Sequence, residues 1–78
     1  QKHGEYRNDK LEGWCYDYDK SPILIGEGNY HLGIKEGYHK TYVNGKLESE
    51  GKYINNKKWG TWKFYNSEGK LILQENYE

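Results

Sequence analysis

One pattern of tyrosines and glycines recurs along this chain every 23 or 24 residues. Tyrosines keep this interval at two positions of the pattern, and glycine and leucine each keep it at one more. The members are Tyr6, Tyr30, Tyr53 and Tyr77; Tyr18, Tyr42 and Tyr65; Gly13, Gly37 and Gly60; and Leu24, Leu47 and Leu71. Because four positions share one register, the pattern predicts an array of similar structural units stacked along the chain.

The pattern divides the chain into units 4–27, 28–50 and 51–75, and residues 76–78 begin a fourth. The shared skeleton is Gly-x-Tyr, a polar loop, Gly, four residues, Tyr, a turn and then Leu. Length differences fall in the turns, where insertions are tolerated best, and the first unit has Ser21-Pro22-Ile23 there. With 78 residues in all, we expect residues 1–78 to form a single repeat domain.

The third unit carries the fullest version of this skeleton, with Tyr53, Asn55, Gly60, Trp62, Tyr65, Gly69, Lys70 and Leu71. This pattern resembles the MORN repeat in its bacterial variant, and the resemblance covers almost the whole chain. The first and second units depart from it, with Cys15 and His39 at the position of the tryptophan. The resemblance implies an elongated antiparallel β-meander with one hairpin per repeat, and it says little about function because the family serves many roles.

Composition supports the same fold without the family. The 13 aromatic residues are nine Tyr, three Trp and one Phe, alongside ten Gly and no Met, a set that favours strands and turns. Asn44-Gly45 between Val43 and Lys46 is a strong signal for a type I′ hairpin, which pairs Tyr42 with Leu47. We therefore predict an all-β fold, a single-layer antiparallel β-meander of repeated hairpins.

Continuing that hairpin without interruption sets Tyr38 opposite Gly51, and in the first unit Trp14 opposite Gly28. An aromatic ring over a strand glycine restores the packing that the glycine lacks. We therefore predict that Tyr38 covers Gly51.

Alternation along the strands then assigns two faces. One carries the repeated aromatic and leucine residues: Trp14, Tyr18, Leu24, Tyr30, Tyr38, Tyr42, Leu47, Tyr53, Tyr65, Leu71 and Tyr77. The other is polar in the first two units and apolar in the third: Cys15, Asp17, Ile25, His39, Thr41, Glu48, Glu50, Ile54, Trp62, Phe64 and Ile72. This assignment requires an odd residue count or a bulge in the connections 7–10, 32–35 and 55–58.

Catalytic and metal chemistry find little support in the residues. Cys15 and His39 occupy equivalent positions two strands apart, roughly 10 Å, whereas a nucleophilic Cys–His pair needs about 3 Å. His3, His31, His39 and Cys15 lack the spacing of a zinc site. We expect no enzyme activity, metal or cofactor. The 12 basic and 12 acidic residues give net charge zero, which argues against a nucleic-acid partner.

Exposed aromatic surface and open sheet edges both suit protein binding. We therefore interpret the chain as a non-enzymatic protein–protein interaction or scaffold module that binds through an aromatic sheet face or a sheet edge. A homodimer through a sheet edge or face is a further alternative. The candidate binding residues are Trp14, Tyr18, Tyr30, Tyr38, Tyr42, Tyr53, Trp59, Trp62, Phe64 and Tyr65.

Two alternatives come from the resemblance. Bacterial proteins with this repeat variant are commonly labelled antitoxin or immunity components, which would make the partner a toxin. Eukaryotic MORN proteins are often linked to phospholipid binding. The basic residues available for lipid headgroups are Lys57, Lys58 and Lys63 beside Trp59, which also fit a solvated hairpin tip. The sequence identifies neither the partner nor the cellular compartment.

Overall fold

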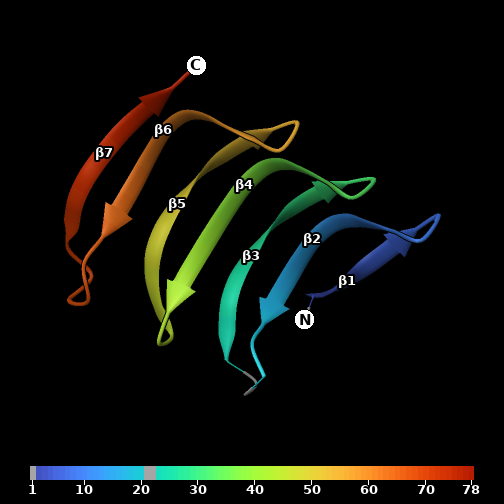
Figure 1. Cartoon of the computed structure of the whole chain (residues 1–78), viewed down its shortest axis with the longest axis horizontal. Coiled ribbons are helices and arrows are strands. Elements are labelled where there is room, and N and C mark those ends of the chain that lie inside the picture. The colour runs from blue at the N-terminus through green and yellow to red at the C-terminus, as the bar shows by residue number, and fades with distance from the viewer. Residues whose placement is uncertain (1, 21–22) are drawn as a thin grey trace.

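The computed structural model describes residues 2–20 and 23–78, so Ser21 and Pro22 of the first turn lie outside it. Seven antiparallel strands form one sheet in the order of the chain (Figure 1). They are β1 (Lys2–Arg7), β2 (Lys10–Tyr18), β3 (Leu24–His31), β4 (Ile34–Val43), β5 (Lys46–Ile54), β6 (Lys57–Tyr65) and β7 (Leu71–Tyr77). The predicted all-β, single-layer meander is confirmed.

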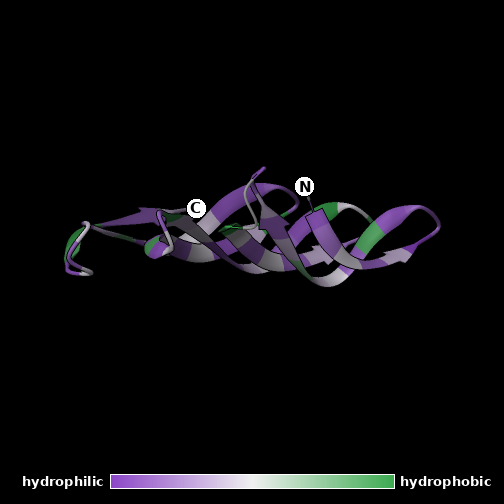
Figure 2. Cartoon of the chain, turned by 90° about the horizontal axis from the view of Figure 1, so that it is seen from below, coloured by the Kyte–Doolittle hydropathy of each residue, from purple (hydrophilic) through white to green (hydrophobic). Residues whose placement is uncertain are grey.

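The sheet has no second layer among the described residues. Its Cα extents are 39 × 34 × 13 Å, and Figure 2 shows a thin, twisted ribbon with few strongly hydrophobic residues. The described part of the chain contains no helix, and so none that is long and apolar enough to cross a membrane.

Two-residue turns close four of the hairpins. Both residues of each turn have positive φ, as a type I′ turn requires: Asn8-Asp9, Leu32-Gly33, Asn44-Gly45 and Asn55-Asn56. Asn, Asp and Gly adopt this conformation at low cost, which explains the turn predicted at Asn44-Gly45. The longer turn between β6 and β7 is organised by Asn66, whose Oδ1 accepts hydrogen bonds from the amides of Glu68 and Lys70 at 2.9 and 3.0 Å.

A bulge follows the first pairs of the hairpin. Tyr42 lies opposite Leu47 as predicted, but Thr41 then lies opposite Ser49, so Glu48 is an extra residue. One extra residue follows the equivalent Tyr–Leu pair in the other two units. A slip of one residue turns every later side chain to the other face. The predicted pairing of Tyr38 with Gly51 is therefore wrong, because His39 lies there instead.

The first unit shows the same displacement. Cys15 lies opposite Gly28, and the predicted partner Trp14 lies opposite Asn29. Neither Trp14 nor Tyr38 covers the glycine assigned to it.

The predicted faces must also be corrected. At the other end of the sheet, each two-residue turn is followed by a bulge of two extra residues. Between the pairs Gly28–His39 and Tyr30–Lys35, for example, one residue faces three. An even number of extra residues does not turn the later side chains to the other face. Gly37, with φ 96°, lies in this bulge, a backbone region open mainly to glycine.

As a result, the predicted aromatic face splits in two. The "ring face" holds Cys15, Tyr30, His39, Tyr53, Trp62, Phe64 and Tyr77. The "open face" holds Trp14, Tyr18, Tyr38, Tyr42, Trp59 and Tyr65, together with Leu24, Leu47 and Leu71 opposite its tyrosines.

Side chains of the even-numbered strands lie over glycines of the preceding strand on the ring face. A Cβ built on each glycine would fall 2.1–2.4 Å from the covering side chain. The three contacts are Cys15 over Gly4, His39 over Gly28 and Trp62 over Gly51. Contacts between a large side chain and a strand glycine therefore exist, but they come from the strand on the other side. His39 covers Gly28 in place of the predicted Trp14, and Trp62 covers Gly51 in place of the predicted Tyr38.

Edge-on ring contacts join these units into a continuous core. Tyr30, His39, Tyr53 and Trp62 follow one another with centroid distances of 5.1, 5.0 and 5.1 Å. Two ring nitrogens find backbone partners: Trp62 Nε1 donates to the carbonyl of Lys52 at 2.9 Å, and His39 Nε2 lies 2.7 Å from that of Asn29.

Lysines cover this core from the solvent side. Lys35 Nζ lies 4.7 Å from the ring centroid of Tyr53, and Lys58 Nζ lies 5.1 Å from that of Trp62. Each ammonium group lies over its ring in a cation–π arrangement. Trp62 is consequently only 2% exposed in a sheet with one layer.

Candidate functional site

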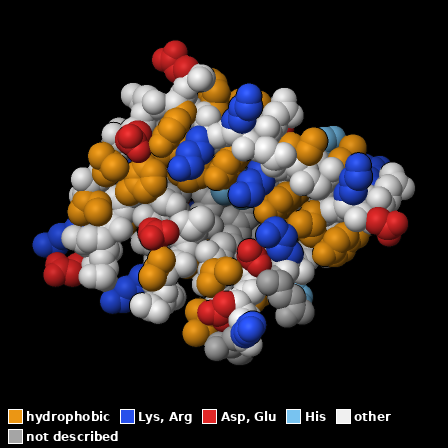
Figure 3. Space-filling model, in the orientation of Figure 1, with side chains coloured by type: hydrophobic (Ala, Val, Ile, Leu, Met, Phe, Trp, Pro, Cys, Tyr) orange, Lys and Arg blue, Asp and Glu red, His pale blue; other side chains and the backbone are white. Residues whose placement is uncertain are grey.

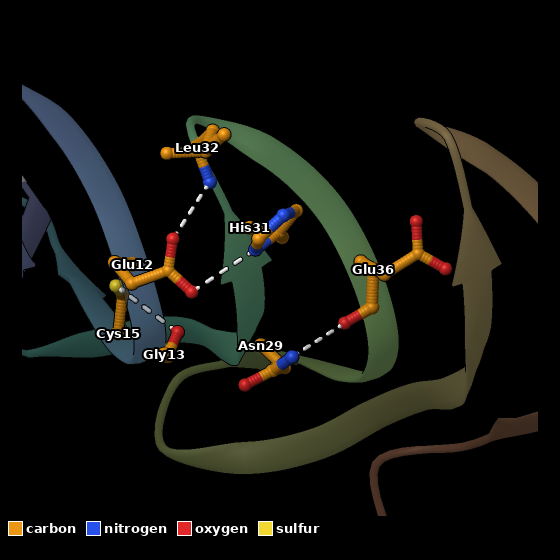
Figure 4. A network of polar contacts seen from close by, with 7 residues as sticks. All are labelled: Glu12, Gly13, Cys15, Asn29, His31, Leu32 and Glu36. Atoms are coloured by element: carbon orange, nitrogen blue, oxygen red, sulfur yellow. Dashed lines mark hydrogen bonds and ion pairs between the residues drawn. The ribbon is translucent and has the colours of Figure 1, made fainter. Parts of the chain in front are cut away.

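Contacts between successive units repeat at the hairpin tips. Glu12 Oε1 accepts from the amide of Leu32 at 3.0 Å, and its other oxygen lies 3.2 Å from His31 Nδ1 (Figure 4). In the next unit, Glu36 accepts from the amide of Asn55 at 3.3 Å. A carboxylate of one unit thus accepts a hydrogen bond from the hairpin turn of the next unit.

The third unit departs from the array at two of its contact positions. Trp59 replaces the carboxylate equivalent to Glu12 and Glu36, and Glu75 replaces the covered glycine of the other units. Both changes lie where a further hairpin would pack, so this end of the sheet presents a different surface from the internal junctions.

The edge strand β7 is the most exposed apolar segment. Leu71, Ile72 and Leu73 are 49%, 63% and 49% exposed, and among the described residues β7 pairs only with β6. Sheet edges are normally protected by charges or proline, whereas Glu75 is the one charged residue of β7.

The other edge, β1, is protected in the usual way. Its six residues include Lys2, Glu5 and Arg7, and Lys2 forms an ion pair with Asp17 of β2 at 3.3 Å. The two edges of the sheet therefore differ in kind, and β7 is the one suited to pairing.

Carboxylates orient several rings of the open face. Glu27 accepts from Trp14 Nε1 at 2.9 Å and from the hydroxyl of Tyr42, and Glu50 accepts from the hydroxyl of Tyr65. Burial and the hydrogen bond to Glu27 raise the pKa of Tyr42 to about 12, and the hydrogen bond to Glu50 raises the pKa of Tyr65.

The structure separates the predicted binding residues by face and by burial. Tyr30 and Trp62 are buried on the ring face, beside Tyr53 and Phe64. The open-face members are Trp14, Tyr18, Tyr38, Tyr42, Trp59 and Tyr65, of which Trp14, Tyr38 and Trp59 are clearly exposed, at 39%, 54% and 47%. The predicted set is thus part core and part surface.

Sequence reasoning did not select Leu71-Ile72-Leu73 as a site. A run of three aliphatic residues without alternation is the signal that could have identified it.

A hollow of about 120 Å³ lies on the ring face, bordered by Cys15, Tyr30, Lys35 and His39 among others. Burial raises the pKa of the Cys15 thiol and lowers that of His39, so both groups are neutral near pH 7. Cys15 Sγ lies 3.5 Å from the carbonyl of Gly13 and His39 Nε2 bonds to backbone. This arrangement does not activate a thiolate nucleophile. Within the described residues, no group of three or more His, Cys, Asp or Glu side chains could hold a metal ion.

The basic residues considered for lipid headgroups do not share one surface. Lys58 lies over the rings of Trp62 and Phe64 on the ring face, whereas Lys63 lies opposite Glu50 on the open face. A membrane surface would meet only part of this group from either side.

Comparison with known proteins adds no assignment. No family model, curated protein or solved structure matches the chain.

Proposed function

We propose that this chain is a non-enzymatic protein-binding module that pairs β7 with an extended strand of its partner. The observation that carries the proposal is the exposed edge of β7, with three consecutive aliphatic residues and a single charge. Strand addition of this kind gains affinity from main-chain hydrogen bonds and specificity from the alternating side chains.

The bulge at the start of β7 limits the length of this pairing. Tyr65 lies opposite Leu71 and Phe64 opposite Leu73, so Ile72 is the extra residue. A bulge bends its strand and disturbs the ladder locally. We therefore expect the regular pairing to run over 73–77, with the side chain of Ile72 providing an apolar contact beside it.

The test uses affinity capture with the immobilised chain and with Leu73→Lys. A lysine on the edge should disfavour strand addition, so the variant should lose a partner that the wild type retains. Val43→Lys is the matched control, because Val43 is also 49% exposed but lies at the end of an internal strand. Equal capture by all three proteins would rule out the β7 edge.

Sedimentation equilibrium over a concentration series decides whether a second copy fills the edge. Self-association that is insensitive to salt and is abolished by Leu73→Lys would identify the partner strand as β7 of another molecule. A monomer at all concentrations would leave the edge for a different protein.

A further inference from the structure

A line of three exposed aromatic rings crosses the strands on the open face. Trp14 pairs with Asn29, and Tyr38 and Trp59 both pair with Lys52 from opposite sides. Asn29 lies opposite the bulge that ends at Tyr38. The resulting row, which we call the open row, is Trp14, Asn29, Tyr38, Lys52 and Trp59.

The strand ladder fixes the spacing of the rings. They lie on β2, β4 and β6, and alternate strands of a sheet are roughly 9.6 Å apart. Trp14 is held in place by its hydrogen bond to Glu27 at 2.9 Å. The Lys52 ammonium lies 5.6 Å from the ring centroid of Tyr38, on a long exposed side chain that is free to turn towards a ligand.

Charges beside the open row alternate in sign. Glu27, Lys40, Glu50 and Lys63 lie opposite one another on β3, β4, β5 and β6. These four charges cancel and leave Lys52 as the single charge within the open row, so this surface has no strong preference for a charged ligand. It does offer closely spaced donors and acceptors to a neutral ligand that is rich in hydroxyl groups.

The same arrangement is poorly suited to a protein partner. The core of a protein interface is depleted of charged residues. Here the charged Lys52 lies between Tyr38 and Trp59. The polar Asn29 lies between Trp14 and Tyr38. On the face of the molecule that Figure 3 shows, charged side chains are interspersed with hydrophobic ones. Isolated rings at a regular interval favour a ligand with its own regular interval.

We propose that the open row binds a neutral, β-1,4-linked polysaccharide laid across the strands. Each pyranose of such a chain has a face of C–H groups that stacks on an aromatic ring and hydroxyls around its edge. Successive sugars are turned over, so alternate sugars present the same face, as alternate strands present the rings. Glu27, Lys40 and Lys52 lie beside the path to bond the hydroxyls. This site goes beyond the proposed strand pairing at β7 and does not depend on it.

Titration of the full chain with chitohexaose and cellohexaose, followed by tryptophan fluorescence and calorimetry, tests the proposal. At least one of these oligosaccharides should bind saturably. Trp14→Ala and Trp59→Ala should each weaken binding at least tenfold. Maltohexaose, which is α-linked and curved, and a heparin hexasaccharide, which is anionic, should bind at least tenfold more weakly than the β-linked ligand.

Two control variants separate this site from other surfaces. Tyr6→Ala removes an exposed tyrosine at the repeated position of Tyr30, on the ring face, and should leave sugar binding unchanged. Leu73→Lys alters the β7 edge and should also leave it unchanged. Circular dichroism of every variant verifies folding.

Other outcomes would overturn the proposal. These are the absence of saturable binding to any β-linked oligosaccharide, equal affinity of the tryptophan variants, or a preference for heparin. If both sugars fail while a protein partner requires Trp14 and Trp59, the open row is a protein contact and the polysaccharide assignment is wrong.

Discussion

The ring face and the open face carry the same kinds of aromatic side chain, but the ring face buries them and the open face leaves them exposed. On the ring face, Trp62 lies over Gly51 and is 2% exposed. On the open face, Trp14 lies opposite Asn29 and is 39% exposed. The difference is set by the neighbouring strand, because the glycine there leaves room for the ring of Trp62. Aromatic content therefore does not distinguish core from binding surface in a single-layer sheet.

The largest expected effect comes from removing the most buried ring. Trp62→Ala should cost about 3–5 kcal/mol of unfolding free energy, because the ring fills the space over Gly51 and its Nε1–H bonds to Lys52. Small domains have about 5–15 kcal/mol in total. Chemical denaturation measures the loss, and Trp14→Ala, expected to cost under about 1 kcal/mol, is the control. Similar losses for the two variants would contradict the division into two faces.

The second largest loss of stability is expected where a side chain is added to a covered glycine. Gly51→Ala would place a Cβ 2.3 Å from the Trp62 ring, and such overpacking costs about 1–3 kcal/mol. Gly26→Ala is the matched control, because a Cβ there would lie 3.5 Å from its nearest neighbour. Denaturation midpoints should fall for Gly51→Ala and stay nearly constant for Gly26→Ala. A well-tolerated Gly51→Ala would mean that Trp62 does not pack over this glycine.

The third prediction compares a turn with an exposed ring. Asn56 has φ 67°, its Oδ1 accepts from the amide of Lys35 at 2.9 Å and its amide donates to the Lys35 carbonyl at 3.1 Å. Asn56→Ala should therefore cost about 1–2 kcal/mol, more than Tyr38→Ala. This reverses the order that follows from placing Tyr38 over Gly51. Thermal unfolding of both variants decides between them.

The smallest expected effect is a pH dependence from His39. Burial lowers its pKa in the folded state below the ordinary 6.5, with Lys35 and Lys2 acting in the same direction. The unfolded chain then binds the proton first, so stability falls as pH drops through about 6.5 and levels off below the folded-state pKa. The melting temperature should fall between about pH 8 and pH 5.5. His39→Trp, which supplies the ring of the third unit, should flatten this slope, and an unchanged slope would show that another group is responsible.

Much of this fold could be predicted from particular residues. Asn44-Gly45 defines its hairpin, the repeated Tyr–Leu pairs define the strands that flank the turns, and the interval of 23 or 24 residues defines the number of hairpins. Turn chemistry and strand alternation are local, so they can be derived without knowledge of the neighbours.

The candidate site could be predicted less well from the sequence. Tyr38 was assigned to a covered glycine because its hairpin was extended without a bulge. The same omission in each of the three units placed Tyr30, Tyr53 and Tyr77 on the wrong face. Likewise, the exposure of Leu73 depends on whether another strand follows β7 in the sheet, and sequence reasoning did not select it.

The sequence by itself determined the repeat, the turn at Asn44-Gly45 and the single-layer meander, since these depend on residues close together in the chain. Only the tertiary structure decided which rings became core and which stayed exposed. Extra residues such as Glu48 shift the pairing of two strands, and burial depends on the side chain that the neighbouring strand then supplies. Cross-strand contacts of this kind are fixed by the register of the assembled sheet.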